Sequence, residues 1–165
     1  MKPMSVIVRT VCNVFTWFLM VFGAYVIIHG HLTPGGGFQG GAVVATGVAF
    51  LLVAEGGDRL FAWIRPLYLT LLESVGLLVF LGLGFWGIRK SFFQNVLANS
   101  GSLFFGLPTP LGSNPGTLAT SGTIALMNLA VGLEVMAGLS MILVVMFKGI
   151  RLYETQNKGE AGHDR

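Results

Sequence analysis

Apolar residues run along this chain in four long blocks, separated by glycine-rich or polar segments. A helix needs about 20 mostly apolar residues to cross a membrane, and each block reaches or approaches that length. The blocks cover residues 10–28, 38–54, 67–88 and 123–147. This pattern predicts an all-α membrane protein, a bundle of four transmembrane helices that forms one domain over residues 1–153.

Composition indicates the same fold class. Of the 165 residues, 53% are hydrophobic and only 10% are charged, whereas a soluble protein usually carries about 25% charged residues. The Lys and Arg residues are scattered and are not grouped with exposed aromatic side chains, so we exclude nucleic acid as a partner. The single cysteine, Cys12, lies in the first block, where we expect a small core residue and no internal disulfide.

The distribution of positive charge predicts how the helices lie in the membrane. The first block is too long for a signal peptide and lacks a small-residue cleavage site, so we expect it to be retained. Four spans place both termini on one side, with eight of the ten Lys and Arg residues. These eight are Lys2, Arg9, Arg59, Arg65, Lys148, Arg151, Lys158 and Arg165. Only Arg89 and Lys90 lie opposite, so both termini are expected to be cytoplasmic.

Two segments lie outside the four spans. The outer connection, residues 89–122, is rich in Gly, Ser, Asn and Pro but also holds two phenylalanine pairs, at 92–93 and 104–105. Such side chains seek burial or the membrane interface, so this loop is expected to pack over its own bundle or against a neighbouring subunit. Residues 154–165 form a short polar cytoplasmic tail, which we expect to be mobile.

The segment HGHLTPGGGFQGG, residues 29–41, follows the first block on the outer side. It is not a phosphate-binding loop of the nucleotide-triphosphate type, because a helix precedes it and no lysine follows it. His29 and His31 make an incomplete metal site, since no carboxylate or thiol lies near them in sequence. We expect both histidines at the membrane interface, bonded to water, lipid headgroups or a partner chain, and a pH-sensing role stays open.

The same segment is expected to break the helical path and to permit close packing. Pro34 prevents the first helix from continuing, and the glycines permit backbone approaches that a side chain would block. Gly37, Gly41, Ala45 and Ala49 recur every four residues, which predicts a smooth helix face pressed against another helix. Gln39, in the first turn of the second helix, either makes interhelical hydrogen bonds or lines an ion path.

Two carboxylates are predicted to lie inside the membrane. Glu134 is about midway along the fourth block and Glu73 about six residues into the third. An acidic residue at the centre of a membrane helix costs about 2.5 to 3.5 kcal/mol, so it usually faces the interior of the protein. No Lys or Arg occurs in the middle of any block, so each glutamate is either neutral, bound to a cation, or paired across a subunit interface.

The motif that begins at Thr33 resembles the MnhB/MrpB family, the small membrane subunits of multisubunit Na⁺/H⁺ antiporters. Its residues are Thr33, Pro34, Gly35, Gly36, Gly37, Phe38, Gln39, Gly40 and Gly41. With the four-helix layout and the outer loop, the resemblance covers residues 15–147. It implies a prokaryotic cytoplasmic membrane, other membrane subunits as partners, and Na⁺ and H⁺ as the ions moved. Related subunits occur in archaeal membrane-bound hydrogenases and sulfane sulfur reductases, where an antiporter-like module is joined to a redox arm.

These observations predict a non-enzymatic subunit of a sodium/proton-translocating complex, with Glu134 and Glu73 as candidates for the ion path. An alternative is a scaffold subunit without an ion of its own, which would hold larger subunits through the glycine stripe and the outer loop. A self-sufficient small exporter is a third hypothesis, and it would require oligomerisation. One cysteine cannot hold an iron–sulfur cluster and the histidines show no haem pattern, so we expect no cofactor and no metal.

Overall fold

The structure, a computed structural model, describes residues 4–56, 65–88, 91–113 and 117–163, with side chains as far as residue 156. Its helices are α1 (Val6–Ile28), α2 (Gly37–Glu55), α4 (Pro66–Trp86), the short 3-10 helix Leu118–Thr120, and α5 (Thr123–His163). Each of the four α-helices is long and apolar enough to cross a membrane. The predicted all-α fold with four spans is therefore confirmed.

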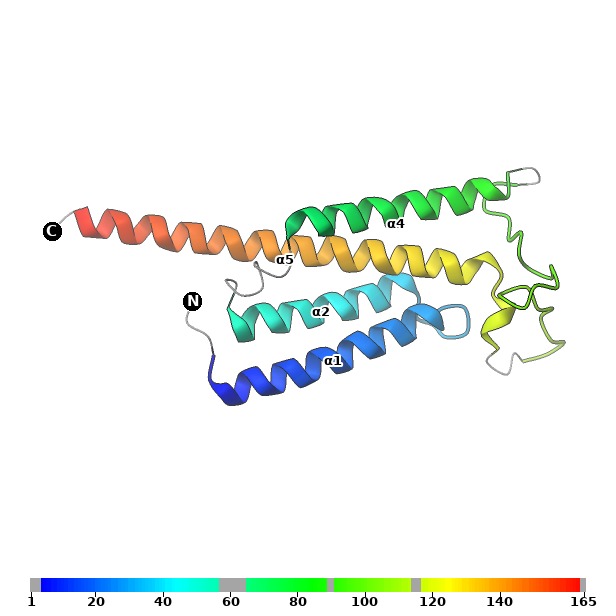
Figure 1. Cartoon of the computed structure of the whole chain (residues 1–165), viewed down its shortest axis with the longest axis horizontal. Helices are drawn as coiled ribbons and strands as arrows, with labels where there is room; N and C mark the ends of the chain where they lie inside the picture. Colours follow the sequence, from blue (N-terminus) through cyan, green and yellow to red (C-terminus); the bar gives the residue numbers. More distant parts are fainter. Residues whose placement is uncertain (1–3, 57–64, 89–90, 114–116, 164–165) are drawn as a thin grey trace.

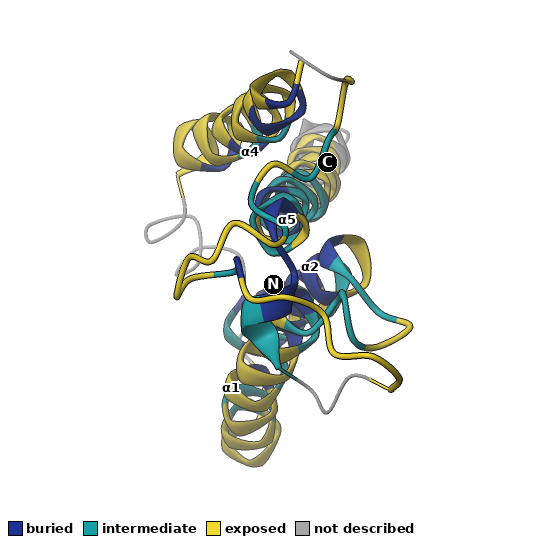
Figure 2. Ribbon diagram, turned by 90° about the vertical axis from the view of Figure 1, so that its right-hand side faces the viewer, coloured by how far each residue is buried: buried dark blue, intermediate teal, exposed yellow. Residues whose placement is uncertain are grey.

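The four helices lie side by side in a row, in the order α4, α5, α2, α1 (Figures 1 and 2). Helix α5 lies between α4 and α2, and α2 lies between α5 and α1. Within the described chain, α4 packs chiefly against α5. Most of the surface of α4 and of α1 is therefore left for lipid or for other proteins.

Helices α1 and α2 meet through glycines that allow their backbones to touch. A Cβ atom at Gly40 would lie 2.5 Å from the side chain of Ile27 and 2.6 Å from the carbonyl oxygen of Gly23. About two helical turns away, the buried Thr16 hydroxyl donates a hydrogen bond of 3.2 Å to the carbonyl oxygen of Gly47. Small residues serve this purpose at membrane helix interfaces because no hydrophobic effect drives helices together in lipid.

A second glycine face of α2 packs against α5. A Cβ atom at Gly41 would lie 2.7 Å from the carbonyl oxygen of Gly132 and 3.0 Å from the side chain of Val135. A Cβ atom at Gly37 would likewise lie 2.9 Å from Val131. The predicted close-packing stripe is thus confirmed at these two glycines, and its partner is a helix of the same chain.

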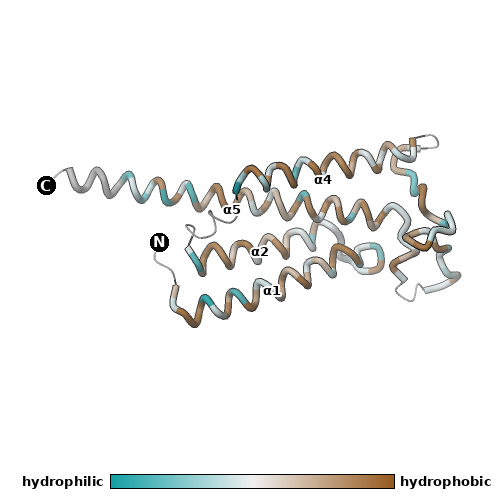
Figure 3. Tube along the Cα trace, viewed as in Figure 1, coloured by the Kyte–Doolittle hydropathy of each residue, from teal (hydrophilic) through white to brown (hydrophobic). Residues whose placement is uncertain are grey.

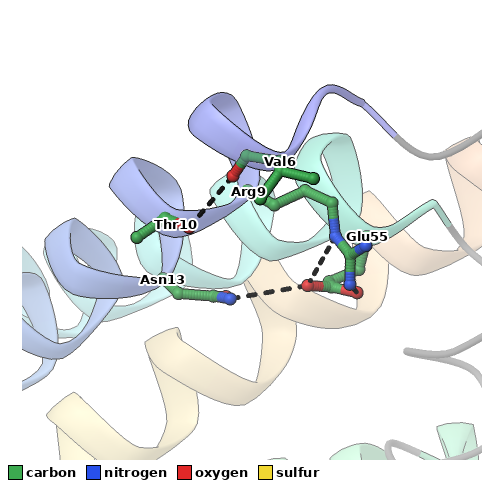
Figure 4. A network of polar contacts seen from close by, with 5 residues as sticks. All are labelled: Val6, Arg9, Thr10, Asn13 and Glu55. Carbon is green, nitrogen blue, oxygen red and sulfur yellow. Dashed lines mark hydrogen bonds and ion pairs between the residues drawn. The ribbon is translucent and has the colours of Figure 1, made fainter.

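An ion pair joins the start of α1 to the end of α2 (Figure 4). The Arg9 guanidinium donates to both carboxylate oxygens of Glu55, at 3.2 and 2.7 Å. The side-chain amide of Asn13 donates to the same carboxylate at 3.4 Å. Glu55 is the last residue of α2, so these contacts hold the end of α2 against the first turns of α1. A bidentate Arg–carboxylate pair fixes geometry as well as supplying energy.

Hydrophobic residues occur along most of the length of α1, α2 and α4 and along the first part of α5 (Figure 3), and many of them are exposed. Trp17, Phe18 and Val21 on α1 are exposed, as are Leu78 and Phe85 on α4. In water, such surfaces would drive aggregation, whereas in a bilayer they face hydrocarbon or other membrane helices.

The outer loop folds back on the ends of α4 and α5. Phe93 occupies the space beside Gly84 and packs against Phe80 with ring centroids 5.3 Å apart, and Phe92 packs against Phe85 at 5.2 Å. Of the two alternatives that the sequence left open, this phenylalanine pair packs on its own bundle, against α4. In the second pair, Phe104 is 79% exposed, against 49% for Phe92 and 41% for Phe93.

Asn95, in the same loop, caps α5 from a distance of 28 residues in sequence. Its side-chain oxygen accepts hydrogen bonds from the backbone N–H of Thr123, at 2.7 Å, and from the Thr123 hydroxyl, at 3.1 Å. Its amide donates to the carbonyl oxygen of Ser121 at 3.2 Å. The first N–H groups of a helix have no partner within the helix, so this side chain satisfies one of them.

Helix α5 is longer than the fourth block predicted. It runs for 41 residues, to His163, which is about 60 Å at 1.5 Å per residue. The backbone of residues 154–163 therefore continues the helix, although we predicted a separate tail from residue 154. No proline interrupts this stretch, and its Glu, Gln, Lys and Ala residues favour helix. The end of α5 projects beyond the other helices (Figure 1).

Helix α1 begins and α5 ends on the same side of the row (Figure 1), as an even number of spans requires. Arg9 and Arg65 lie close to that side, at the start of α1 and of α4. Lys148 and Arg151 lie in the part of α5 that leads toward it. Of the other basic residues in the orientation argument, Lys2, Arg59, Arg89, Lys90 and Arg165 lie outside the described residues, as does the side chain of Lys158.

Replacing Gly41 with leucine is expected to destabilise the subunit itself. The new side chain would collide with the α5 backbone at Gly132, and overpacking of this kind costs about 1–3 kcal/mol or more. Gly82 on α4 is the matched control, because a Cβ atom there meets nothing within 4 Å. The midpoint of thermal unfolding in detergent should fall for Gly41→Leu and stay unchanged or rise for Gly82→Leu. Equal midpoints for the two variants would contradict the α2–α5 contact.

Removing the Asn95 side chain, which caps the start of α5, should also lower the stability of the subunit. Asn95→Ala leaves the N–H of Thr123 without its acceptor, which costs about 1 kcal/mol for a typical cap. Asn95→Asp keeps an acceptor oxygen but loses the donor to Ser121, so its unfolding midpoint should lie between those of the wild type and the alanine variant. A midpoint for Asn95→Ala equal to that of the wild type would show that α5 does not depend on this cap.

Candidate functional site

The predicted motif forms the turn between the end of α1 and the start of α2. We call these helix ends, opposite the start of α1, the outer end, after the orientation predicted from the sequence. His29 ends α1, and its ring nitrogen lies 3.0 Å from the carbonyl oxygen of Tyr25, on which the imidazole also stacks. Thr33 donates to the carbonyl oxygen of His29 through its backbone N–H, at 3.1 Å, and through its hydroxyl, at 3.2 Å. Pro34 follows, so the chain leaves the helix and turns back within eight residues.

Gln39 and Gly36 close the start of α2. The backbone N–H of Gly36 donates to the Gln39 side-chain oxygen at 3.0 Å, which is one half of a capping box. The Gln39 residue is exposed, as is Phe38. The observed hydrogen bond of Gln39 is therefore local to its own helix end and does not connect two helices.

Asn128 of α5 points into this turn. Its amide nitrogen lies 2.6 Å from where a Cβ atom at Gly30 would be. Its side-chain oxygen lies 3.6 Å from where a Cβ atom at Gly36 would be. Glycine at both positions leaves room for the amide. In the described part of the chain, this amide nitrogen and both ring nitrogens of His31 are buried without a hydrogen-bond partner. Polar groups with unused hydrogen-bonding capacity therefore gather where the turn meets α5.

Glu73 and Glu134 both lie at the contact between α4 and α5, which run antiparallel (Figure 1). Glu134 packs beside Gly76, where a Cβ atom would lie 3.1 Å from the Cβ of Glu134. A carboxylate oxygen of Glu73 lies 3.4 Å from the Cβ position of Gly138. The pairing is reciprocal: each helix carries a glutamate and, one turn away, a glycine that accommodates the glutamate of the other helix.

Neither glutamate has a hydrogen-bond or ion-pair partner among the residues that the structure describes. The described ion pair joins Arg9 to Glu55 and leaves no cation beside Glu73 or Glu134. Both side chains are half-buried, so this chain alone does not enclose them. No group of three or more His, Cys, Asp or Glu residues that could hold a metal ion occurs in the described chain.

The polar residues near the start of α5 that could supply oxygen ligands lie away from Glu134. Thr123 is bonded to Asn95 at the start of α5, and it is 11 residues from Glu134, about 16 Å along the helix. The hydroxyl of Thr120 donates to the carbonyl oxygen of Thr117 in the outer loop. Asn128 faces the glycine turn, about 9 Å along α5 from Glu134. His29 and His31 are likewise at the outer end. The structure thus groups the candidates into an outer polar cluster and a glutamate pair.

Sequence reasoning missed the Arg9–Glu55 pair and the Asn95 cap. Both connect residues that are far apart in sequence, and neither belongs to a short motif. Arg9 lies directly before the first apolar block and Glu55 directly after the second, but these positions alone do not indicate that the two side chains meet.

A disulfide can test the register of α4 against α5. Cys12→Ser removes the native thiol, and Gly76→Cys with Glu134→Cys places two Cβ atoms about 3.1 Å apart, close to the roughly 3.5–4.5 Å of natural disulfides. Mild oxidation should join the two helices, as mass spectrometry of proteolytic fragments would reveal. The pair Gly82→Cys with Glu134→Cys is the control and should stay reduced, because nothing lies within 4 Å of Gly82. Cross-linking of the control alone would contradict the register.

A family model described as "Domain related to MnhB subunit of Na+/H+ antiporter" matches residues 7–141. The chain is 36% identical over 124 residues to "Uncharacterized protein MJ1307" of Methanocaldococcus jannaschii, an alignment that covers 74% of this chain and 44% of that protein. It is 33% identical over 79 residues to "Putative antiporter subunit mnhB2" of Staphylococcus aureus, covering 48% and 55% of the two proteins.

The chain spans about half the length of the curated relatives it matches. The family model nevertheless covers α1 from Ile7 onward, α2, α4 and the part of α5 as far as Met141, together with the glycine turn and the glutamate pair. The resemblance seen in the sequence is therefore confirmed, and this multi-pass membrane protein belongs to the MnhB family.

Proposed function

We propose that this protein is a non-catalytic membrane subunit of a multisubunit Na⁺/H⁺ antiporter-type complex, in which the contact between α4 and α5 borders an ion path. Family membership and the four spans support the membrane-subunit part of the proposal. The complex would lie in a prokaryotic cytoplasmic membrane, with both termini in the cytoplasm as the distribution of Lys and Arg indicates. Its other subunits are then membrane proteins, and the ions moved are Na⁺ and H⁺.

The observation that carries the proposal is the glutamate pair. Glu73 lies seven residues from the start of α4 and Glu134 eleven residues from the start of α5, about 10 and 16 Å into helices that cross a hydrocarbon core of roughly 30 Å. Carboxyl groups at this depth are expensive, and they are typical of ion and proton pathways. Two of them at one helix contact, each beside a glycine, make that contact the strongest candidate in the chain.

The surroundings of the pair suggest how ions would be handled. Each carboxyl group is accessible from outside the chain and has no cation beside it in the described residues. A neutral carboxyl group can release a proton to, and take one from, water or a group on a neighbouring subunit. Na⁺ needs more oxygen ligands than one carboxylate provides, so a sodium site here would require oxygens from a partner subunit.

The outer polar cluster gives the path a second component. Asn128 and His31 combine buried, unpartnered nitrogen atoms with a glycine turn that brings α2 close to α5. Broken helix geometry at membrane depth is tolerated where it is buried in protein or lines a wet cavity. Between Asn128 and Glu134, α5 rises about 9 Å, a gap that water or groups of a partner would bridge.

A scaffold role without ion binding is the second candidate, and the extensive apolar surface of α1 and α4 favours it. A scaffold would not use the glycine stripe for partners, because Gly37 and Gly41 are already packed against α5 of the same chain. Either role is compatible with a stand-alone antiporter or with the antiporter-like module of a respiratory complex. A self-sufficient exporter would have to form a pathway by oligomerisation and would transport ions as the purified chain.

The test is sodium-dependent proton flux in membrane vesicles that contain the whole complex. Glu134→Gln should lower the flux by about tenfold or more, because an amide cannot exchange the proton or carry the charge of the carboxyl group. Glu73→Gln should cause a comparable loss, since both glutamates lie at the same helix contact. Glu154→Gln is the matched control, because it removes an exposed carboxyl group of α5 that lies 20 residues beyond Glu134 and outside the predicted fourth block, residues 123–147.

Subunit content must be measured on the same vesicles. Loss of flux with every subunit present supports a position on the ion path. Normal flux in the assembled Glu134→Gln and Glu73→Gln complexes overturns the ion-path proposal and favours the scaffold role. Transport by the purified subunit alone in liposomes would support the self-sufficient exporter instead.

A further inference from the structure

The part of the outer loop from Ser91 to Gly122, which we call the outer cap, contains no Asp, Glu, Lys, Arg or His. It is 32 residues long, and its described residues, 91–113 and 117–122, lie between the end of α4 and the start of α5. A water-exposed segment of this length would usually carry about eight charged residues, a quarter of its composition. The lack of charged residues in the outer cap is therefore typical of a surface that is covered by something other than water.

Backbone hydrogen bonds give the outer cap a defined shape. The N–H of Gly101 donates to the carbonyl oxygen of Gly106 at 3.1 Å, which closes a short turn. Across the cap, the N–H of Leu107 donates to the carbonyl oxygen of Ala119 at 3.0 Å. The N–H of Gly122 donates to the carbonyl oxygen of Phe105 at 2.7 Å and so ties this turn to the start of α5.

This shape holds large apolar side chains away from the rest of the chain. Leu103 and Phe104 lie in the turn closed by Gly101 and Gly106, and they are 86% and 79% exposed. Leu111 is fully exposed. The other aromatic pair, Phe92 and Phe93, packs against α4. The outer cap is therefore attached to α4 through Phe92 and Phe93, whereas Phe104 of the other pair is exposed.

We propose that the outer cap, with Leu103 and Phe104 at its centre, is a docking surface for the uncharged, apolar extramembrane surface of another protein subunit. The cores of protein interfaces are poor in charged residues and rich in large apolar and aromatic side chains, as the cap is. The inference extends the proposed function, which requires partners but does not say where they bind. It is independent of the glutamate pair.

A lipid surface fits the outer cap less well than a protein does. Segments that rest in the headgroup region are anchored by Trp, Tyr, Lys and Arg. The outer cap contains none of these four residue types. Its exposed polar groups are instead hydroxyls and amides of Ser, Thr, Asn and Gln, which form hydrogen bonds with a protein surface without the cost of burying a charge.

Thiol protection tests the proposal directly. Phe104→Cys in a Cys12→Ser background places one thiol at the centre of the surface, and a membrane-impermeant maleimide reports its accessibility. Labelling is compared in membranes that contain the whole complex and in membranes that contain only this chain, each normalised to labelling after denaturation. We expect labelling to be slower by about tenfold or more in the complex, the scale of a buried interface position.

The other outcomes overturn the proposal. Protection in both membranes would mean that lipid or the chain itself covers Phe104, and fast labelling in both would mean that nothing covers it. Substitutions give a second measurement on the complex: Phe104→Glu should lower co-purification of the other subunits by about tenfold or more, whereas Phe104→Leu should stay close to wild type. Unchanged co-purification for Phe104→Glu would also overturn the proposal.

Discussion

The structure depends on one constraint: its helices must be held together by close steric fit. Lipid is as apolar as the side chains, so the hydrophobic effect does not drive helices together in a membrane. Helix α2 meets that need with two glycine faces, one against α1 and one against α5. Gly40 and Gly41 are adjacent in sequence and lie about 100° apart around the helix. Gly40 therefore contacts α1 while Gly41 contacts α5. The glycine-rich motif is therefore first of all the means by which α2 fits between its two neighbours.

The same packing rule shapes the candidate site. At the contact of α4 with α5, Gly76 and Gly138 leave space that the glutamates of the facing helices occupy. Glycine here allows the helices to approach while each carboxyl group stays beside the contact. In the part of the chain that the structure describes, the ion pair lies between Arg9 and Glu55, and neither Glu73 nor Glu134 has a cation partner.

The outer end of the molecule combines rigid attachment with an uncovered surface. Asn95 joins the outer cap to α5, and the phenylalanines at 92 and 93 join it to α4. The remainder of the cap presents apolar side chains without a single charge. Large apolar side chains are also exposed along α1 and α4, so exposed apolar surface extends from the helices to the outer cap.

The sequence by itself determined the four spans, the break at Pro34, the glycine stripe and the depth of Glu73 and Glu134. Hydropathy, helix-breaking residues and position along a span are local properties, which can be read without knowing what lies next to each residue. Only the tertiary structure decided that Gly41 faces α5, that Asn128 turns toward the glycine motif, and that Glu73 and Glu134 share one contact. These results depend on the rotation and register of one helix against another, which steric fit sets between residues far apart in the chain. For the same reason, the ion pair of Arg9 with Glu55 and the cap provided by Asn95 had no counterpart in the sequence pattern.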